Sequence, residues 1–208
     1  MNILITAGPT REYIDDVRYI SNRSSGRMGY AIAFAAQEAG HQVTLISGPT
    51  SLTAGDGITV HCLTTSEEMH AKVMAEIDKH EVFIATAAVA DFKLRQRVKG
   101  KLKKATFNGR LDLVPTVDIL AEVGRLYGGK KLLIGFALES EDGEANALNK
   151  MRDKRLDAIL LNDPTSLDSE HSKVLIMLPD GRRFPIGPAK KFVIARELIK
   201  LMPNFRRG

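Results

Sequence analysis

The chain has 208 residues, of which 44% are hydrophobic and 26% are charged, and its formal net charge at pH 7 is +5. This balance is typical of a globular protein with a substantial core, so we expect a single domain over residues 1–208. No apolar run reaches the roughly 18 residues of a membrane span, and the N-terminus lacks a signal pattern, so we expect a cytoplasmic protein without membrane contact. The basic residues do not interleave with aromatic ones, which argues against nucleic acid and leaves acidic small molecules as partners.

Apolar runs rich in β-branched residues alternate with helical patterns along the chain. The expected strands cover residues 3–6, 42–47, 58–63, 82–86, 131–136 and 158–161, and the expected helices cover residues 27–39, 66–80, 117–127 and 143–155. Such alternation predicts an α/β, Rossmann-like, three-layer fold with a parallel sheet and helices on both faces. Ligands of such sheets bind at the carboxyl ends of the strands. The single cysteine, Cys62, lies in an apolar run and is expected to be a buried packing residue.

Two regions depart from this alternation. Residues 91–109 are basic and poorly periodic, with Gly100 and Gly109 as pivots, so we expect a mobile basic flap. Near the C-terminus, residues 173–178 and 183–186 flank Pro179-Asp180-Gly181, which predicts a β-hairpin. A closing helix is expected over residues 188–201, because Pro188 is acceptable in a first helical turn.

The most informative segment is residues 18–29, which lie between an expected strand and an Ala-rich expected helix. A strand, a loop rich in Ser and Gly, and a helix present free backbone N–H groups to an anion. Gly26 and Gly29 lack a Cβ and can let a phosphate approach the backbone, while Ser24 and Ser25 can cap the helix or donate hydroxyls. The loop over residues 7–23 is too long for a dinucleotide-binding turn, and the G-x-G-x-x-G pattern is absent. We therefore expect a ligand other than a simple dinucleotide.

Two further stretches contain residues suited to a nucleotide site. The run Ala85-Thr-Ala-Ala-Val-Ala-Asp91 follows an expected strand, so a ligand can lie against its small residues, with the Asp91 carboxylate at the rim. Tight sheet–helix packing with a capping aspartate explains the same pattern equally well. Lys101-Leu-Lys-Lys104 lies in the expected flap, where cations can close over a triphosphate, although a solvated charged loop has the same composition.

Other candidates follow the next two strands. Lys150 and Lys154 share a helix face, which favours an anion between their ammonium groups but is also common on exposed helices. Phe136 ends a strand, where its ring can form the wall of a base-binding site or pack in the core, and Asn162 ends the next strand at the same sheet edge. The five histidines show no metal-ligand spacing, and no metal ligand is assigned.

Taken together, these segments closely resemble the phosphopantothenoylcysteine synthetase family of coenzyme A biosynthesis. The matching pieces appear in the family's order: Thr6-Ala-Gly-Pro-Thr-Arg-Glu12, Val17-Arg-Tyr-Ile-Ser-Asn22, Ser24-Ser-Gly-Arg-Met-Gly29, Ala87-Ala-Val-Ala-Asp91, Lys101-Leu-Lys-Lys104, Gly135-Phe136 and Leu161-Asn-Asp163. The resemblance implies a ligase that joins 4′-phosphopantothenate to L-cysteine through an acyl-nucleotide, with Mg²⁺ and release of pyrophosphate. In many bacteria this domain is half of a bifunctional protein with a flavin-dependent decarboxylase. Here the chain starts at the first synthetase strand, so we expect no flavin and consider a separate decarboxylase as a partner.

The resemblance also implies roles for individual residues. Lys101 would be the flap cation of the first half-reaction, and Asn22 would hold the acyl-nucleotide and protect it from hydrolysis. The substrate-binding residues would be Arg18, Asn22, Ala87, Ala88 and Asp91, with Arg18 contributed by the neighbouring subunit of a homodimer. The nucleotide-binding residues would be Gly8, Ser24, Gly26, Gly29, Ala85, Thr86, Ala87, Asp91, Lys101, Val117, Asp118, Ile119, Leu120, Phe136, Lys150, Lys154 and Asn162.

The K-x-K-K flap and the Lys150/Lys154 pair match the bacterial type of the family, which implies CTP rather than ATP. One departure concerns the nucleotide segment, where the family often has Lys-Asn-Pro-Asp and this chain has Pro115-Thr-Val-Asp118. Asp118 is kept, so a nucleotide contact is still expected around Val117–Leu120.

Two other functions are compatible with parts of the pattern. A nicotinamide-dependent reductase on a Rossmann-like fold would need a G-x-G-x-x-G-type turn and an acidic residue after the second strand, where this chain has Ser47-Gly48. A non-catalytic nucleotide-binding module would have the same loop with an inert flap.

Overall fold

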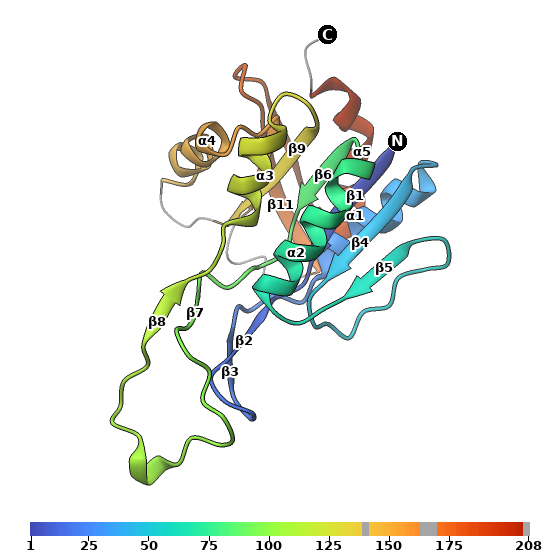
Figure 1. Cartoon of the computed structure of the whole chain (residues 1–208). Helices are drawn as coiled ribbons and strands as arrows, with labels where there is room; N and C mark the ends of the chain where they lie inside the picture. Colours follow the sequence, from blue (N-terminus) through green and yellow to red (C-terminus); the bar gives the residue numbers. More distant parts are fainter. Residues whose placement is uncertain (139–141, 163–169, 206–208) are drawn as a thin grey trace.

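An eight-stranded sheet forms the centre of the molecule (Figure 1). The computed structural model describes residues 1–138, 142–162 and 170–205, so Asp163 of the last matching motif lies outside the described residues. The strands lie in the order β12 (Arg183–Lys190), β11 (His171–Met177), β10 (Ala158–Asn162), β9 (Leu132–Leu138), β6 (Val82–Ala85), β1 (Asn2–Ala7), β4 (Gln42–Ser47) and β5 (Thr59–Cys62). The strands from β10 to β5 pair in parallel, whereas β11 and β12 form an antiparallel hairpin on β10. The parallel sheet and the C-terminal hairpin are both confirmed.

Helices cover both faces of this sheet. Helices α1 (Arg27–Glu38) and α5 (Lys191–Leu201) pack on one face, and α2 (Ser66–Glu76), α3 (Ile119–Tyr127) and α4 (Gly143–Asp153) pack on the other. A hydrophobic core lies on each face of the sheet, and alternate residues of β1 pack into one core or the other, because successive side chains of a strand point to opposite faces. Ile3 and Ile5 pack on the side of α1, and Leu4 packs on the side of α2. The three-layer fold is therefore confirmed. Within the described ranges, no helix is long and apolar enough to cross a membrane.

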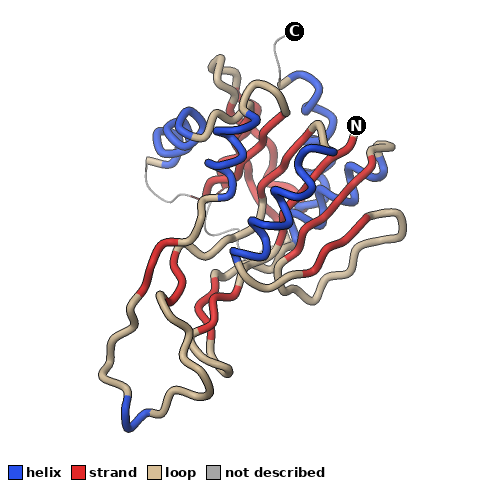
Figure 2. Tube along the Cα trace, viewed as in Figure 1, coloured by secondary structure: helices blue, strands red, loops and turns tan. Residues whose placement is uncertain are grey.

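Two small hairpins project beyond the carboxyl edge of the sheet, as the short red strands in Figure 2 show. Strands β2 (Arg11–Tyr13) and β3 (Tyr19–Ser21) pair within the long loop that follows β1. Strands β7 (Phe92–Leu94) and β8 (Leu113–Pro115) pair to form a stem, and the basic flap is the loop beyond this stem. The sequence pattern does not predict either hairpin, because strands of three residues are too short to show alternation.

Three expectations about boundaries and burial are wrong. The closing helix begins at Lys191 rather than at Pro188, because β12 continues to Lys190, which pairs with His171. Helix α3 begins at Ile119, and the Asp118 side chain caps it by accepting a hydrogen bond from the Ala121 N–H at 2.9 Å. Cys62 is exposed, because β5 is the edge strand and Cys62 is its last residue.

Candidate active site

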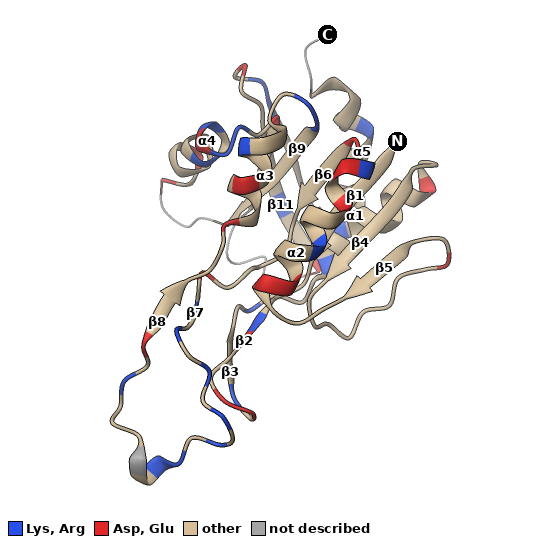
Figure 3. Cartoon of the chain, viewed as in Figure 1, with Lys and Arg blue, Asp and Glu red and all other residues tan. Residues whose placement is uncertain are grey.

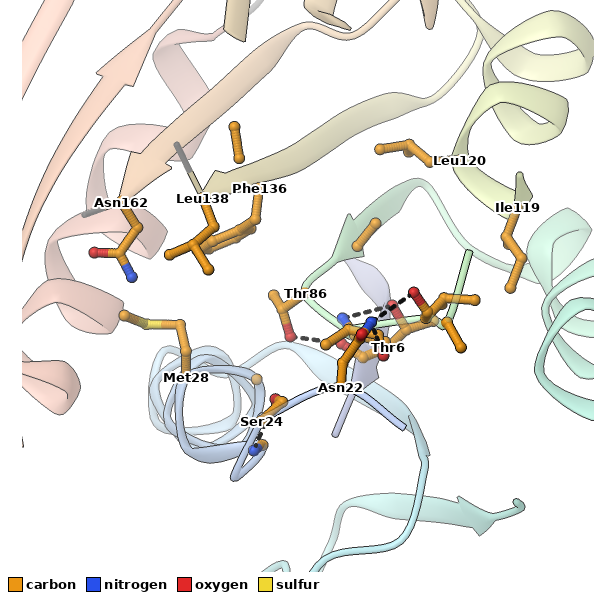
Figure 4. A pocket seen from close by; sticks show the side chains of 18 of the residues that line it. Thr6, Asn22, Ser24, Met28, Thr86, Ile119, Leu120, Phe136, Leu138 and Asn162 are labelled. Carbon is orange, nitrogen blue, oxygen red and sulfur yellow. Dashed lines mark hydrogen bonds between the residues drawn. The ribbon is translucent and has the colours of Figure 1, made fainter. Parts of the chain in front are cut away.

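A cavity of about 600 Å³ opens at the carboxyl edge of the sheet. The strand order reverses here, because the chain passes from β1 to β4 and β5 on one side and returns to β6 on the other. Such reversal points are the usual ligand sites of open α/β sheets. The residues in its wall come from the loop before α1, the ends of β6, β9 and β10, the segment before α3, and helix α4; Figure 4 shows many of their side chains.

The N-terminus of α1 forms one wall of this cavity. Gly26 is its N-cap residue and has a φ of 75°, a left-handed conformation that suits glycine. No side chain caps this helix: the Ser24 hydroxyl instead accepts from the Gly26 N–H at 3.4 Å, just outside the helix. The N–H groups of Arg27, Met28 and Gly29, which no intrahelical carbonyl can accept, therefore remain for a ligand. The first turn contains no acidic residue that would compete with an anion.

Gly29 allows the start of α1 to lie directly on the sheet. A Cβ added at Gly29 would lie 2.4 Å from the Thr86 hydroxyl oxygen and 2.5 Å from the Ala7 Cβ. Gly8 is buried beneath the α1 loop next to Gly26 and does not line the cavity. The lack of a side chain at Gly8 and Gly29 therefore allows close backbone packing, and Gly26 and Gly29 both line the cavity.

Asn22 lies at the edge of the cavity across from the end of β6 (Figure 4). Its Nδ2 group donates to the carbonyl oxygens of Ala88 and Val89, at 3.3 and 2.9 Å. These bonds fix the orientation of the amide and leave Oδ1 as its available acceptor. Small residues, from Ala85 to Ala90, form the floor, and Asp91 continues it at an exposed position.

The opposite wall consists of β9, β10, α4 and the start of α3. Phe136 and Asn162 line it as expected (Figure 4), and Lys150 donates to the Phe136 carbonyl oxygen at 2.7 Å. Lys154 forms an ion pair of 2.6 Å with Asp118. Partial burial favours a higher pKa for Asp118, but the hydrogen bond from Lys154 and the Ala121 N–H outweigh it and lower that pKa. The carboxylate of Asp118 is affected by both ammonium groups, because the charges of Lys154 and Lys150 each lower its pKa.

Most of the expected site residues meet at this one cavity. They are Asn22, Ser24, Gly26, Gly29, Ala85, Thr86, Ala87, Ala88, Asp91, Val117, Asp118, Ile119, Leu120, Phe136, Lys150, Lys154 and Asn162. Three others do not line it. Besides Gly8, these are Lys101, which is exposed on the flap, and Arg18, which is held by Asp15 and by the Leu102 carbonyl oxygen. Figure 3 shows basic residues along both arms of the flap, away from the sheet.

Several lining residues were missed in the sequence. Lys191, the first residue of α5, is 9% exposed and lines the cavity, and Thr6, Arg27 and Met28 also contribute. The signal for Lys191 was available, because it follows a strand that ends at the same sheet edge. It was overlooked because the closing helix was expected to begin three residues earlier.

Comparisons with known proteins identify the family of the chain. The model of the family described as DNA/pantothenate metabolism flavoprotein C-terminal domain matches residues 1–205. The chain belongs to this family. Membership confirms the resemblance to phosphopantothenoylcysteine synthetase that the motifs suggested.

Relatives in three bacteria show how much of a longer protein this family domain represents. The coenzyme A biosynthesis bifunctional protein CoaBC of Vibrio vulnificus (strain YJ016) is 38% identical over 206 residues, which are 96% of this chain and 51% of that protein. The CoaBC of Escherichia coli (strain K12) is 41% identical over 188 residues, covering 87% and 46%. That of Bacillus subtilis (strain 168) is 37% identical over 204 residues, covering 96% and 50%. The chain therefore spans about half the length of the curated relatives it matches.

Solved structures confirm the fold of the family domain. The crystal structure of the C-terminal domain of CoaBC has a TM-score of 0.84 and 37% identity, and the match covers 97% of this chain and 93% of that one. A Cab2 mutant in complex with phosphopantothenate-cysteine has a TM-score of 0.80 at 16% identity, covering 98% and 87%. At that identity the second likeness supports the fold alone.

Proposed function

We propose that the chain is a phosphopantothenate–cysteine ligase, which joins 4′-phosphopantothenate to L-cysteine in two steps at the cavity beside α1. In the first step, a carboxylate oxygen of phosphopantothenate attacks the α-phosphorus of CTP, the bond to pyrophosphate breaks, and an acyl-cytidylate forms. In the second step, the cysteine amine attacks the acyl carbon, CMP leaves, and the amine loses a proton as the amide forms. The observation that carries the proposal is the uncapped start of α1 and the oriented Asn22 amide at one cavity.

The cavity suits the charge that this reaction develops. Free N–H groups at a helix start stabilise phosphate oxygens, and the macrodipole adds to that effect. In this proposal the triphosphate lies against Ser24, Gly26 and the first turn of α1, while Phe136 and the segment 117–120 bind the nucleoside. Because the Asn22 Nδ2 group already donates to two carbonyl oxygens, Oδ1 would accept from an O–H or N–H of the phosphopantothenate part. This contact would hold the mixed anhydride in place until the amine arrives.

Mg²⁺ is part of the proposal, and the residues at the cavity are suited to it. Mg²⁺ prefers oxygen ligands and is usually held by one or two carboxylates together with substrate phosphates. Among the described residues, the Asp91 carboxylate has no hydrogen bond or ion pair, whereas Asp118 is paired with Lys154. Asp91 would therefore hold the ion, which when bound would neutralise charge on the phosphates. CTP rather than ATP, a cytoplasmic location and the absence of flavin are also proposals, and they are supported by the sequence analysis alone.

A homodimer completes the proposal, with Arg18 acting in the partner's site. Arg18 points away from the cavity of its own chain, towards the flap. The projecting hairpins expose apolar side chains: Val17 is 60% exposed, Phe92 is 54% exposed, and Tyr19 and Leu113 are each more than 40% exposed. Burying such residues against a second copy would be favourable, at about 25 cal/mol for each Å² of apolar surface.

Pyrophosphate release is the assay that tests this function. With phosphopantothenate and CTP but no cysteine, we expect release limited to about one equivalent per site, and addition of cysteine should start steady turnover. ATP should support a much lower rate. Absence of release with either nucleotide would contradict the ligase proposal. Binding of NADPH at micromolar concentration with transfer of hydride would instead support a reductase, and CTP binding without any release would support a non-catalytic module.

A further inference from the structure

Asp15 lies in the turn of the β2–β3 hairpin, yet its side chain is fully buried. Its carboxylate accepts from the N–H groups of Val17 and Arg18 at 2.8 and 2.7 Å, from the Arg18 Nε at 3.0 Å, and from the Leu102 N–H at 3.0 Å. A buried carboxylate is costly unless it is paired and fully hydrogen-bonded, and Asp15 meets both conditions. The hydrogen bond from Arg18 is the main reason that the pKa of Asp15 is lowered.

The same cluster fastens the flap at the residue after Lys101. Arg18 donates from Nη2 to the Leu102 carbonyl oxygen at 2.7 Å, so the Asp15–Arg18 pair binds both backbone groups of Leu102. The Arg18 guanidinium can do this because its planar fork donates in two directions at once. Lys101 is exposed and adjacent in sequence, so the position of its backbone is set by this pair.

Other contacts already attach the flap to the hairpin. The Val98 N–H donates to the Ile14 carbonyl oxygen at 2.9 Å, and Asp16 and Gly100 exchange two hydrogen bonds of 2.9 and 3.1 Å. The flap would therefore stay beside the hairpin without Asp15. What Asp15 adds is a fixed guanidinium and a fixed backbone beside Lys101. Arg18 and Lys101 are the two cations that the proposed reaction uses, and neither of them lines the cavity of its own chain.

We propose that Asp15 is a positioning residue that holds Arg18 and the flap beside Lys101 as one unit, so that both cations reach the same active site together. This inference rests on the proposed function, and it goes beyond it by making Lys101 act in the site that Arg18 serves. In a homodimer with Arg18 in the partner's site, Lys101 acts in that site too. One buried carboxylate would then connect substrate binding by Arg18 to phosphorus chemistry by Lys101.

The first test is Asp15→Asn, which keeps the shape of the side chain but removes its charge. We expect trypsin to cleave the flap at its lysines faster than in the wild type, in the absence of any substrate. We also expect kcat for pyrophosphate release to fall by about 10- to 100-fold, because a displacement of about 1 Å costs that much. KM for phosphopantothenate should rise as well, while the stoichiometry of CTP binding stays unchanged.

This combination separates positioning from a merely structural role. A folding defect lowers kcat and CTP stoichiometry together and leaves KM unchanged, and that result would overturn the proposal. The matched control is Asp112→Asn, which removes the exposed ion pair between Asp112 and Arg95 (2.7 Å) at the flap stem. It should leave trypsin cleavage, kcat and KM at wild-type values.

Arg18→Lys provides a second variant in case Asp15→Asn does not fold. Lysine keeps the positive charge but cannot bridge Asp15 and the Leu102 carbonyl oxygen together. We expect faster flap cleavage and a lower kcat although Lys101 is intact. Unchanged cleavage and unchanged kcat would overturn the inference.

Mixed dimers test the shared site directly. An Asn22→Asp chain and a Lys101→Gln chain should each form little amide alone. When mixed, they should recover about a quarter to a half of the wild-type rate of amide formation, because one site then contains both intact residues. No recovery in proven mixed dimers would refute action in the partner's site. If the wild type makes no amide, the proposed function fails, whereas the trypsin comparison still decides whether the Asp15 cluster holds the flap.

Discussion

Gly29→Ala tests whether the start of α1 is the phosphate site, because the added methyl group should displace the helix without unfolding the protein. The new Cβ would lie 2.4 Å from the Thr86 hydroxyl oxygen, which cannot turn away easily because it donates to the Thr6 carbonyl oxygen at 2.6 Å. It would also lie 2.5 Å from the Ala7 Cβ, an atom fixed to the strand backbone. Ordinary carbon contacts are about 3.5–4.0 Å, so the helix start must move by about 1 Å.

Two effects of Gly29→Ala on the free energy of unfolding have opposite signs. Overpacking of this kind costs about 1–3 kcal/mol, and replacing glycine by alanine within a helix returns about 1 kcal/mol. The net loss of stability should thus be about 1 kcal/mol, which lowers Tm by about 2–4 °C in a chain of this length. The rate of pyrophosphate release should fall by up to about a hundredfold, since a misplacement of about 1 Å costs that much.

Gly40→Ala is the matched control at the other end of the same helix. No atom lies within 4 Å of a Cβ added there, but its φ of 81° makes alanine unfavourable by about 1–2 kcal/mol. Thermal unfolding and pyrophosphate release are measured on both variants. We expect both to lower Tm, but only Gly29→Ala to reduce the rate and the affinity for CTP. Wild-type kinetics in Gly29→Ala, or an equal loss of rate in Gly40→Ala, would show that the start of α1 is not the phosphate site.

Three further predictions concern single side chains. Lys101→Gln should abolish pyrophosphate release without changing the unfolding curve, whereas Lys99→Gln on the same flap should stay active; normal turnover in the first variant would remove Lys101 from the reaction. Asn22→Asp should still release pyrophosphate but yield little amide, and a full yield of amide would disprove the protective role of Asn22. Glu68 accepts from the N–H groups of Thr65 and Thr64 at the start of α2, which lowers its pKa below 4.5, so its contribution is complete above about pH 4.5 and is lost as the pH falls. Glutamine can still accept these hydrogen bonds but lacks the negative charge, so Glu68→Gln should be less stable than the wild type by about 0.3–1 kcal/mol at pH 7. That difference should shrink by pH 3 in urea unfolding, and a constant difference would contradict the assignment.

The central sheet could be predicted because its strands are buried and continuous in sequence. Residues 42–47 were expected as a strand and are one, since β4 lies between two neighbours and has a buried apolar residue on each face: Val43 and Leu45 on one, Ile46 on the other. Cys62 was misjudged because burial of an edge strand depends on what covers it, and no local pattern records that.

The cavity residues could be predicted to the extent that they follow strands in sequence. Ala85 and Asn162 end parallel strands, and Phe136 lies two residues before the end of β9, which places all three near one edge of the sheet. The hydrogen bond from the Leu102 N–H to Asp15 could not be predicted from the sequence, because the two residues are 87 positions apart. The hairpin that contains Asp15 also has strands of only three residues each, which show no clear alternation. Contacts of this kind depend on tertiary structure alone.

A crystal structure of the chain with CTP and phosphopantothenate would show directly whether the start of α1 binds the triphosphate. We expect nucleotide phosphates on the N–H groups of Arg27 to Gly29, with the phosphopantothenate part within hydrogen-bond distance of the Asn22 Oδ1. A nucleotide bound away from the start of α1, with Asn22 free of ligand, would contradict this expectation.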